Sequence, residues 1–415
     1  MTDTALGRRD HLTFKGNLRE TRYGWLRLTP AYSVHLVSDL LEADWSPGIR
    51  VLDPFCGTGT TALVCAEHGI PATTTDINPF LVWLAEAKTA QYATGDLTAF
   101  SEQAEVVAAA IQSNSNTPEW VPPIYQIEKW WDNRTLHALA RGMAAIRASD
   151  EDVTEGAQRL LRVAFCRAMI ERANVSFGHQ SMSFKKRVAA QAALFDDETP
   201  EALVAASWEA ACSTIVSSAT SPILDAPNVV LADARSLHDA LPEEHFGLVI
   251  TSPPYPNRMS YIRELRPYMY WLGYLADGRE AGELDWQAIG GTWGCATSNV
   301  GKWSPPTPRP IPHPDFETIL AAIRERSDVL ARYVHKYFDD MLDHVASLSK
   351  VLGPDARIHY IVGNSKFYET LLPVEEIYAG LFEQAGFEGV EIQTIRKRSS
   401  KRELFEYLVS ARKPA

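Results

Sequence analysis

The sequence predicts an α/β fold built on a doubly wound, Rossmann-like sheet. Three short runs of apolar or β-branched residues each end at an acidic residue, at Asp53, Asp76 and Asp233, and a fourth run ends at Thr251. A Gly- and Thr-rich turn and a helical pattern follow the first run, and another helical pattern follows the second. Strands that alternate with helices in this way are typical of a parallel sheet covered on both faces.

The predicted elements follow this alternation, with two interruptions. Helical periodicity after the first strand ends at Gly69, a typical helix stop, and it resumes from Pro79 to Ala90. A long helix is expected over residues 316–351, and the last two strands are expected to form an antiparallel pair. The predicted strands are 49–53, 71–76, 228–233, 245–250, 357–362, 390–395 and 405–410, and a further helix covers 374–385.

The two interruptions predict the domain organisation. Residues 1–95 and 227–415 form the predicted catalytic domain, and residues 96–226 form a helical insertion that serves either DNA recognition or a structural role. Within the catalytic domain, residues 256–316 are rich in aromatic residues and end in a Pro-dense stretch. Because proline is excluded from helix interiors and central strands, this segment is predicted to be an extended loop or lid.

Composition excludes several classes of protein. The chain has 415 residues with 46% hydrophobic content, which suits one large core with insertions or two domains. No run of about 18 apolar residues and no signal peptide occur, which predicts a cytoplasmic protein without membrane association. Five irregularly spaced cysteines without a Cys-x-x-Cys pair argue against a disulfide framework and against a metal site.

The net charge of −12 argues mildly against a nucleic-acid partner, because phosphate binding needs positive charge. Local basic clusters meet that need on an acidic protein. The candidate clusters are Lys185–Arg187, then Arg258, Arg263 and Arg266, and finally Arg396–Arg398 with Lys401 and Arg402.

The turn Asp53-Pro54-Phe55-Cys56-Gly57-Thr58-Gly59-Thr60 is a candidate ligand-binding loop. A glycine-rich turn between a strand and a helix lets backbone amides approach a ligand closely. This turn lacks the third glycine of the dinucleotide fingerprint and the Gly-Lys-Ser/Thr ending of a P-loop. Asp76, at the end of the second strand, is placed to accept hydrogen bonds from ribose hydroxyls.

Ser252-Pro253-Pro254-Tyr255 directly follows the fourth strand and is the candidate catalytic motif. The two prolines remove backbone donors, so the Ser252 hydroxyl and the Ser252 and Pro253 carbonyls form a row of acceptors. Acceptors that bind both hydrogens of an exocyclic base amine would localise the nitrogen lone pair for attack on a methyl group. Tyr255 offers a flat face for a base removed from the duplex.

Together the two motifs resemble the amino-methyltransferase branch of the S-adenosylmethionine-dependent DNA methyltransferases. The resemblance implies a class I methyltransferase sheet, S-adenosylmethionine as cofactor, and duplex DNA with a flipped-out base as substrate. Segment 28–32 resembles the N-terminal segment that packs on the methionine end of the cofactor. The implied cofactor-binding residues are Thr29, Pro30, Asp53, Phe55, Cys56, Gly57, Thr58, Gly59, Asp76, Ile77, Asp233 and Ala234.

The first residue of the catalytic motif indicates the target base. In the resembling family, serine at this position is typical of enzymes that act on the N4 amine of cytosine, and aspartate or asparagine of those that act on the N6 amine of adenine. Ser252 therefore favours a cytosine-N4 methyltransferase, associated with a restriction or defence system. Methylation at cytosine carbon 5 is disfavoured, because that chemistry normally uses a Pro-Cys pair and the sequence has none.

Three alternatives stay open at this stage. The enzyme could methylate the N6 amine of adenine in DNA, or a base amine in RNA, because the same acceptor chemistry serves each. The chain could also be a binding protein that keeps the fold without turnover, although the intact Ser252–Tyr255 motif and the strand-end acids argue against this.

Overall fold

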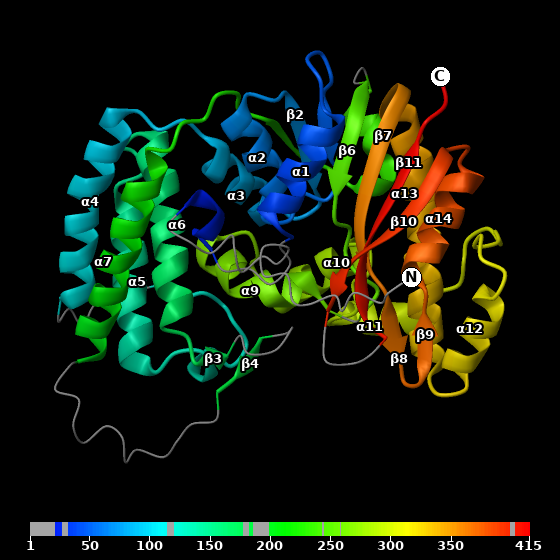
Figure 1. Cartoon of the computed structure of the whole chain (residues 1–415). Coiled ribbons are helices and arrows are strands. Elements are labelled where there is room, and N and C mark those ends of the chain that lie inside the picture. Colours follow the sequence, from blue (N-terminus) through cyan, green and yellow to red (C-terminus); the bar gives the residue numbers. More distant parts are fainter. Residues whose placement is uncertain are drawn as a thin grey trace.

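The computed structural model shows an α/β domain with a central sheet and, beside it, a body of helices (Figure 1). The described residues are 21–26, 32–113, 120–176, 182–185, 199–242, 245–257, 259–398 and 403–415.

Seven strands form the central sheet in the order β10-β11-β7-β6-β1-β2-β5. The strands are β1 (Val51–Asp53), β2 (Ala72–Asp76), β5 (Asn228–Leu231), β6 (Phe246–Thr251), β7 (Leu352–Gly363), β10 (Glu388–Lys397) and β11 (Phe405–Arg412). All neighbours from β5 to β7 pair in parallel, whereas β11 is antiparallel to both β7 and β10. The predicted doubly wound sheet with an antiparallel terminal strand is thereby confirmed.

Helices cover both faces of this sheet. Because side chains alternate along a strand, Leu248 and Ile250 of β6 pack with α1 and α2 on one face, and Val249 packs with α13 and α14 on the other. This double burial explains why the strands β1 and β6 are almost continuously apolar. The helices are α1 (Val34–Asp44), α2 (Thr60–His68), α3 (Pro79–Thr89), α8 (Leu237–Ala240), α12 (Phe316–Arg324), α13 (Asp328–Val351) and α14 (Val374–Gln384).

Four long helices form the helical body between β2 and β5. They are α4 (Thr94–Gln112), α5 (Asn133–Ala148), α6 (Glu155–Glu171) and α7 (Pro200–Ala219). Asp132, Thr154 and Thr199 each cap the helix that follows by accepting hydrogen bonds from its first-turn amides. By length and composition alone, helix α7 could span a membrane. It packs against α4, α5 and α6, however, as a core helix does.

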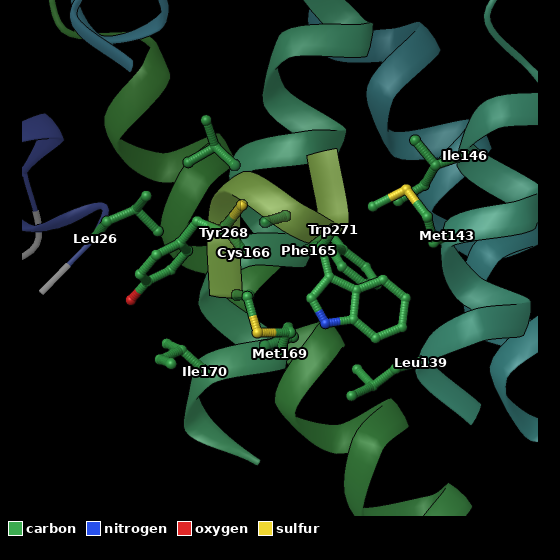
Figure 2. Close-up of a cluster of buried hydrophobic side chains, with 14 of the residues drawn as sticks. Leu26, Leu139, Met143, Ile146, Phe165, Cys166, Met169, Ile170, Tyr268 and Trp271 are labelled. Carbon is green, nitrogen blue, oxygen red and sulfur yellow. The ribbon is translucent and has the colours of Figure 1, made fainter. Parts of the chain in front are cut away.

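The helical body is joined to the catalytic motif through helix α9 (Tyr261–Leu272). Figure 2 shows Tyr268 and Trp271 of α9 among apolar side chains of α5 and α6. Trp271 is fully buried and contacts Phe165 edge-on, at 5.2 Å between ring centroids. This tryptophan is therefore a core residue rather than a base-stacking one.

The prediction of a loop over residues 256–316 was wrong for 261–302. That part contains α9, α10 (Gly278–Gln287) and α11 (Cys295–Lys302), joined by short turns, and the Pro-dense 303–315 is irregular. Side chains of Ser260 and Asp277 cap α9 and α10. Pro267 lies inside α9, where the carbonyl of Arg263 accepts a hydrogen bond from Arg266 Nη1 at 2.7 Å.

The predicted helix over 316–351 is two helices, α12 and α13. The Ser327 hydroxyl starts α13 by accepting a hydrogen bond from the Leu330 amide at 3.3 Å. Two small hairpins were also not predicted, because strands of two or three residues leave little pattern in a sequence. The remaining short elements are η3 (Arg22–Gly24), η4 (Ile127–Lys129), η5 (Ala234–Ser236), β3 (Val175–Ser176), β4 (Ser183–Phe184), β8 (Ser365–Phe367) and β9 (Thr370–Leu372).

Candidate active site

A cavity of about 350 Å³ lies at the carboxyl ends of β1, β2, β5 and β6. This is the edge at which parallel α/β sheets bind ligands. The cavity brings together residues that are separated by more than 300 positions in the sequence. Its lining includes Tyr32, Pro54–Gly57, Asp76–Asn78, Ala232–Ala234, Ser252–Tyr255, Asn257, Tyr261, Arg396, Arg398 and Glu406.

The glycine-rich turn is shaped by two left-handed residues. Gly57 and Gly59 have φ angles of 52° and 75°, which residues other than glycine rarely adopt. The Cys56 amide donates to the Thr75 carbonyl at 2.8 Å and the Gly57 amide donates to Asp76 at 3.0 Å, so the turn is fixed to the end of β2. Cys56 is buried in this turn and lines the cavity.

Asp53 is a buried junction beneath the turn rather than part of the cavity wall. Its carboxylate accepts hydrogen bonds from Thr251 Oγ1 at 2.6 Å, from Tyr32 Oη at 3.0 Å and from the Phe55 amide at 3.1 Å. Thr251 directly precedes Ser252. Asp53 therefore links the N-terminal segment, the glycine-rich turn and the catalytic motif through one carboxylate.

Asp76 lines the cavity with its carboxylate partly occupied. The oxygens accept from the Gly57 amide at 3.0 Å and from the Asn78 amide at 2.9 Å. A carboxylate has about four lone-pair sites, so acceptor capacity remains for ribose hydroxyls. The apolar Ile77 and Leu81 beside it suit the face of an adenine ring.

Burial raises the pKa of Asp53 to about 6, above its ordinary value of 3.8. The folded protein therefore binds more protons than the unfolded chain between these values, and this contribution to stability is lost as the pH rises. We expect the free energy of unfolding of the wild type, relative to Asp53→Asn, to fall from about pH 4 to about pH 6 and then level off. Denaturant titrations of both proteins across this pH range test the expectation. A wild-type free energy of unfolding that rises with pH relative to that of Asp53→Asn would contradict it.

Asp233 lines the cavity, but its carboxylate is held by Arg235. The Arg235 amide donates to it at 2.9 Å and Arg235 Nη2 lies 2.6 Å from Oδ2. Burial alone would raise the pKa of Asp233, but the hydrogen bonds from Arg235 outweigh it and lower the pKa. Arg235 also pairs with Asp340 of α13 at 3.0 Å, a partner that the sequence analysis did not predict.

The other predicted cofactor residues fall into three groups. Phe55, Ile77 and Ala234 line the cavity. Thr58 and Gly59 lie behind it, where the buried Lys88 Nζ donates to the Thr58 carbonyl at 2.9 Å. Thr29 and Pro30 lie outside the described residues, although the adjacent Tyr32 lines the cavity and contacts both Asp53 and Thr61.

The candidate catalytic motif lines the cavity with residues that carry hydrogen-bond acceptors. The Ser252 hydroxyl donates its hydrogen to the Ile361 carbonyl at 2.9 Å, which leaves its oxygen lone pairs as acceptors. Tyr337 Oη of α13 donates to the Pro254 carbonyl at 2.7 Å. Among the described residues no partner occupies the Pro253 carbonyl, so this oxygen and the Ser252 oxygen remain for a substrate amine.

Several cavity residues lay outside the predicted site. Tyr261 accepts from the Tyr255 amide at 3.3 Å, and Tyr255 Oη donates to Glu406 of β11 at 3.0 Å. Arg396 and Arg398 were predicted only as a basic cluster, because their distance from the motif in sequence hides their proximity in space. In the described ranges no group of three or more His, Cys, Asp or Glu side chains is placed to hold a metal ion.

Comparison with known proteins identifies the relationship. The type II methyltransferase M.BsoBI of Geobacillus stearothermophilus is 22% identical over 449 residues, covering 95% of this chain and 84% of that protein. The chain is a homologue of type II methyltransferases. The type II methyltransferases M.AvaI of Anabaena variabilis and M.MjaII of Methanocaldococcus jannaschii match shorter segments, at 35% over 69 residues and 40% over 57, which span 14% and 11% of those proteins.

These relatives confirm the methyltransferase family predicted from the two motifs, and with it S-adenosylmethionine as the methyl donor of this methyltransferase. No family model matches the chain. Among solved structures, the rRNA methyltransferase aviRa from Streptomyces viridochromogenes aligns with 12% identity and a TM-score of 0.30. The alignment covers 92% of the protein described here and 86% of the aviRa chain. This similarity is too low to support an argument about substrate.

Proposed function

We propose that this methyltransferase transfers a methyl group to the exocyclic N4 amine of a flipped-out cytosine in duplex DNA. The observation that carries the proposal is the position of Ser252–Tyr255 at the tip of β6, in the same cavity as Asp76 and the glycine-rich turn. The relatives named as type II methyltransferases support DNA as the substrate.

The protein's own residues supply binding and orientation. Asp76 and Ile77 hold the nucleoside part of the cofactor, and the turn 54–57 faces its methionine part. Bound S-adenosylmethionine supplies a sulfonium methyl group; the amine nitrogen forms the new N–C bond, the S–C bond electrons stay on sulfur, and one amine proton leaves to water. No covalent link to the protein is needed, so catalysis rests on positioning and electrostatics.

The acceptors at the strand tip make the amine reactive. The Ser252 oxygen and the Pro253 carbonyl accept its two hydrogens, which favours a pyramidal nitrogen with a localised lone pair. Tyr255 stacks against the base, at a typical gain of about 1–3 kcal/mol. Cytosine is favoured over adenine because of Ser252, and N6-adenine or RNA base-amine methylation is the alternative.

Residues 96–226 are proposed to contribute to DNA recognition. Part of this region is coupled to the cavity through α9, because Glu264 of α9 accepts a hydrogen bond from the Met182 amide at 2.6 Å and Tyr261 of α9 lines the cavity. Tyr125 is 85% exposed and Phe184 is 43% exposed, and exposed aromatic side chains suit contacts with nucleic acid. A restriction or defence system remains the proposed context, and the cytoplasm the proposed location.

Incubation with radiolabelled S-adenosylmethionine and either duplex DNA or tRNA tests the proposal. Label is expected in the duplex DNA and not in the tRNA. Label in tRNA alone would favour an RNA methyltransferase. Absence of label from both substrates, with cofactor binding verified by calorimetry, would favour a binding protein and contradict the proposed activity.

A further inference from the structure

The terminal strands bring a pair of arginines to the proposed base-binding side of the cavity. Arg396 lies near the end of β10 and Arg398 just beyond it, and both line the cavity together with Glu406 of β11. Because side chains alternate along a strand, residues 396 and 398 share one face and the exposed Lys397 points away.

Arg396 is neutralised by Glu406. Its Nε donates to Glu406 Oε2 at 2.6 Å and its Nη2 donates to Oε1 at 3.3 Å. Glu406 also accepts from Tyr255 Oη at 3.0 Å, so this pair fixes the catalytic tyrosine against β11. Arg396 and Glu406 therefore position Tyr255, and their charges cancel.

Arg398 has a different environment. Its guanidinium carbon lies 4.8 Å from the centroid of the Tyr255 ring, and its Nη1 donates to the Asn364 carbonyl at 2.9 Å. Within the described residues no carboxylate pairs with it, so it brings a positive charge and further N–H donors to the cavity.

The sheet is built to admit this guanidinium. Gly363 of β7 is the cross-strand neighbour of Glu406, and a β-carbon at Gly363 would lie 2.4 Å from Arg398 Nη1 and 2.9 Å from the Tyr255 ring. Any larger residue at Gly363 would displace one of these two groups. The absence of a side chain at this position is therefore what allows Arg398 and Tyr255 to lie together.

We propose that Arg398 selects cytosine by donating hydrogen bonds to the O2 and N3 atoms of the flipped base. Beside its amine, cytosine carries two adjacent acceptors, whereas adenine carries N1 and a C–H group in the corresponding positions. The arginine fork suits two adjacent acceptors, as it does those of guanine in the major groove. This inference rests on the proposed function and adds a specificity-determining residue to it.

The test uses the full-length protein and duplex oligonucleotides that contain its target site, mapped beforehand by sequencing methylated plasmid DNA from expressing cells. The target position carries cytosine, adenine or an abasic sugar. Arg398→Ala is expected to lower kcat/KM for cytosine roughly 10- to 100-fold and to lower the cytosine-to-adenine preference by a similar factor. Arg398→Lys, which keeps the charge but not the fork, is expected to restore little of the loss.

Binding to the abasic duplex separates contact with the base from contact with phosphate. If Arg398 contacts the base, Arg398→Ala weakens binding of the cytosine duplex but leaves abasic binding unchanged. Equal weakening of binding to both duplexes, or full recovery of activity in Arg398→Lys, would show that Arg398 contacts phosphate. Either result would overturn this inference and leave the proposed function standing. A wild-type protein that methylates no duplex would overturn the proposed function and this inference with it. Arg326→Ala is the matched control and should match the wild type, because Arg326 is an exposed arginine between α12 and α13 that does not line the cavity.

Discussion

Replacement of Ser252 by alanine is expected to lower kcat roughly 100- to 1,000-fold, the typical cost of removing one preorganised hydrogen-bonding group from an active site. The Ser252 hydroxyl is oriented by its hydrogen bond to the Ile361 carbonyl at 2.9 Å, so its lone pairs are preorganised for an amine hydrogen. The Ser252 hydroxyl bonds to the Ile361 carbonyl and the Tyr255 hydroxyl and not to the turn 54–57, so the dissociation constant for S-adenosylmethionine should change less than about two-fold.

Single-turnover methylation and calorimetric cofactor binding together check this expectation. Tyr255→Ala is expected to behave in the same way, because it removes the stacking surface. Ser349→Ala is a suitable control, since Ser349 lies in α13 outside the cavity and its hydroxyl bonds only within its own helix. Full activity in Ser252→Ala would place the chemistry elsewhere in the cavity.

Replacement of Asp76 by alanine is expected to weaken S-adenosylmethionine binding roughly 10- to 100-fold, the usual worth of charge-assisted hydrogen bonds. Two effects act together. The ribose loses its acceptor, and the Gly57 amide, now 3.0 Å from a carboxylate oxygen, loses the partner that holds the turn. The loss should therefore exceed that of a single hydrogen bond.

Isothermal titration calorimetry measures the dissociation constant, and thermal denaturation verifies that the variant folds. Asp225→Ala removes an exposed aspartate outside the cavity and should bind the cofactor as the wild type does. A dissociation constant for Asp76→Ala within about two-fold of the wild type would show that this carboxylate does not hold the ribose.

The strand-end residues could be predicted because local sequence determines them. Asp76, Asp233 and Ser252 each stand at the end of a run of apolar or β-branched residues, and parallel strands bring their carboxyl ends to one edge of the sheet. The same rule placed Asp53 at this edge, but it did not distinguish a ligand from a buried junction. That distinction depends on Tyr32 and Thr251, which reach Asp53 from other elements.

The site residues that the sequence did not predict depend on contacts between distant segments. Glu406 and Arg398 meet Tyr255 only because β11 inserts between β7 and β10, and no local pattern near Tyr255 signals it. Likewise Tyr337 looks like one more apolar position of α13, yet it fixes the Pro254 carbonyl. The loop predicted over 256–316 was wrong for 261–302 for a related reason. Most of the prolines stand at 305–314 and exclude a helix only there, whereas Pro267 is accommodated inside α9.

Mass spectrometry of nucleosides from DNA methylated by this protein tests the central claim most directly. Duplex DNA incubated with the wild type and S-adenosylmethionine is digested to nucleosides, with Ser252→Ala as the matched inactive control. The predicted result is N4-methylcytosine from the wild type and none from the variant. N6-methyladenine without N4-methylcytosine would contradict the assignment of cytosine as the target base, and with it the role proposed for Arg398.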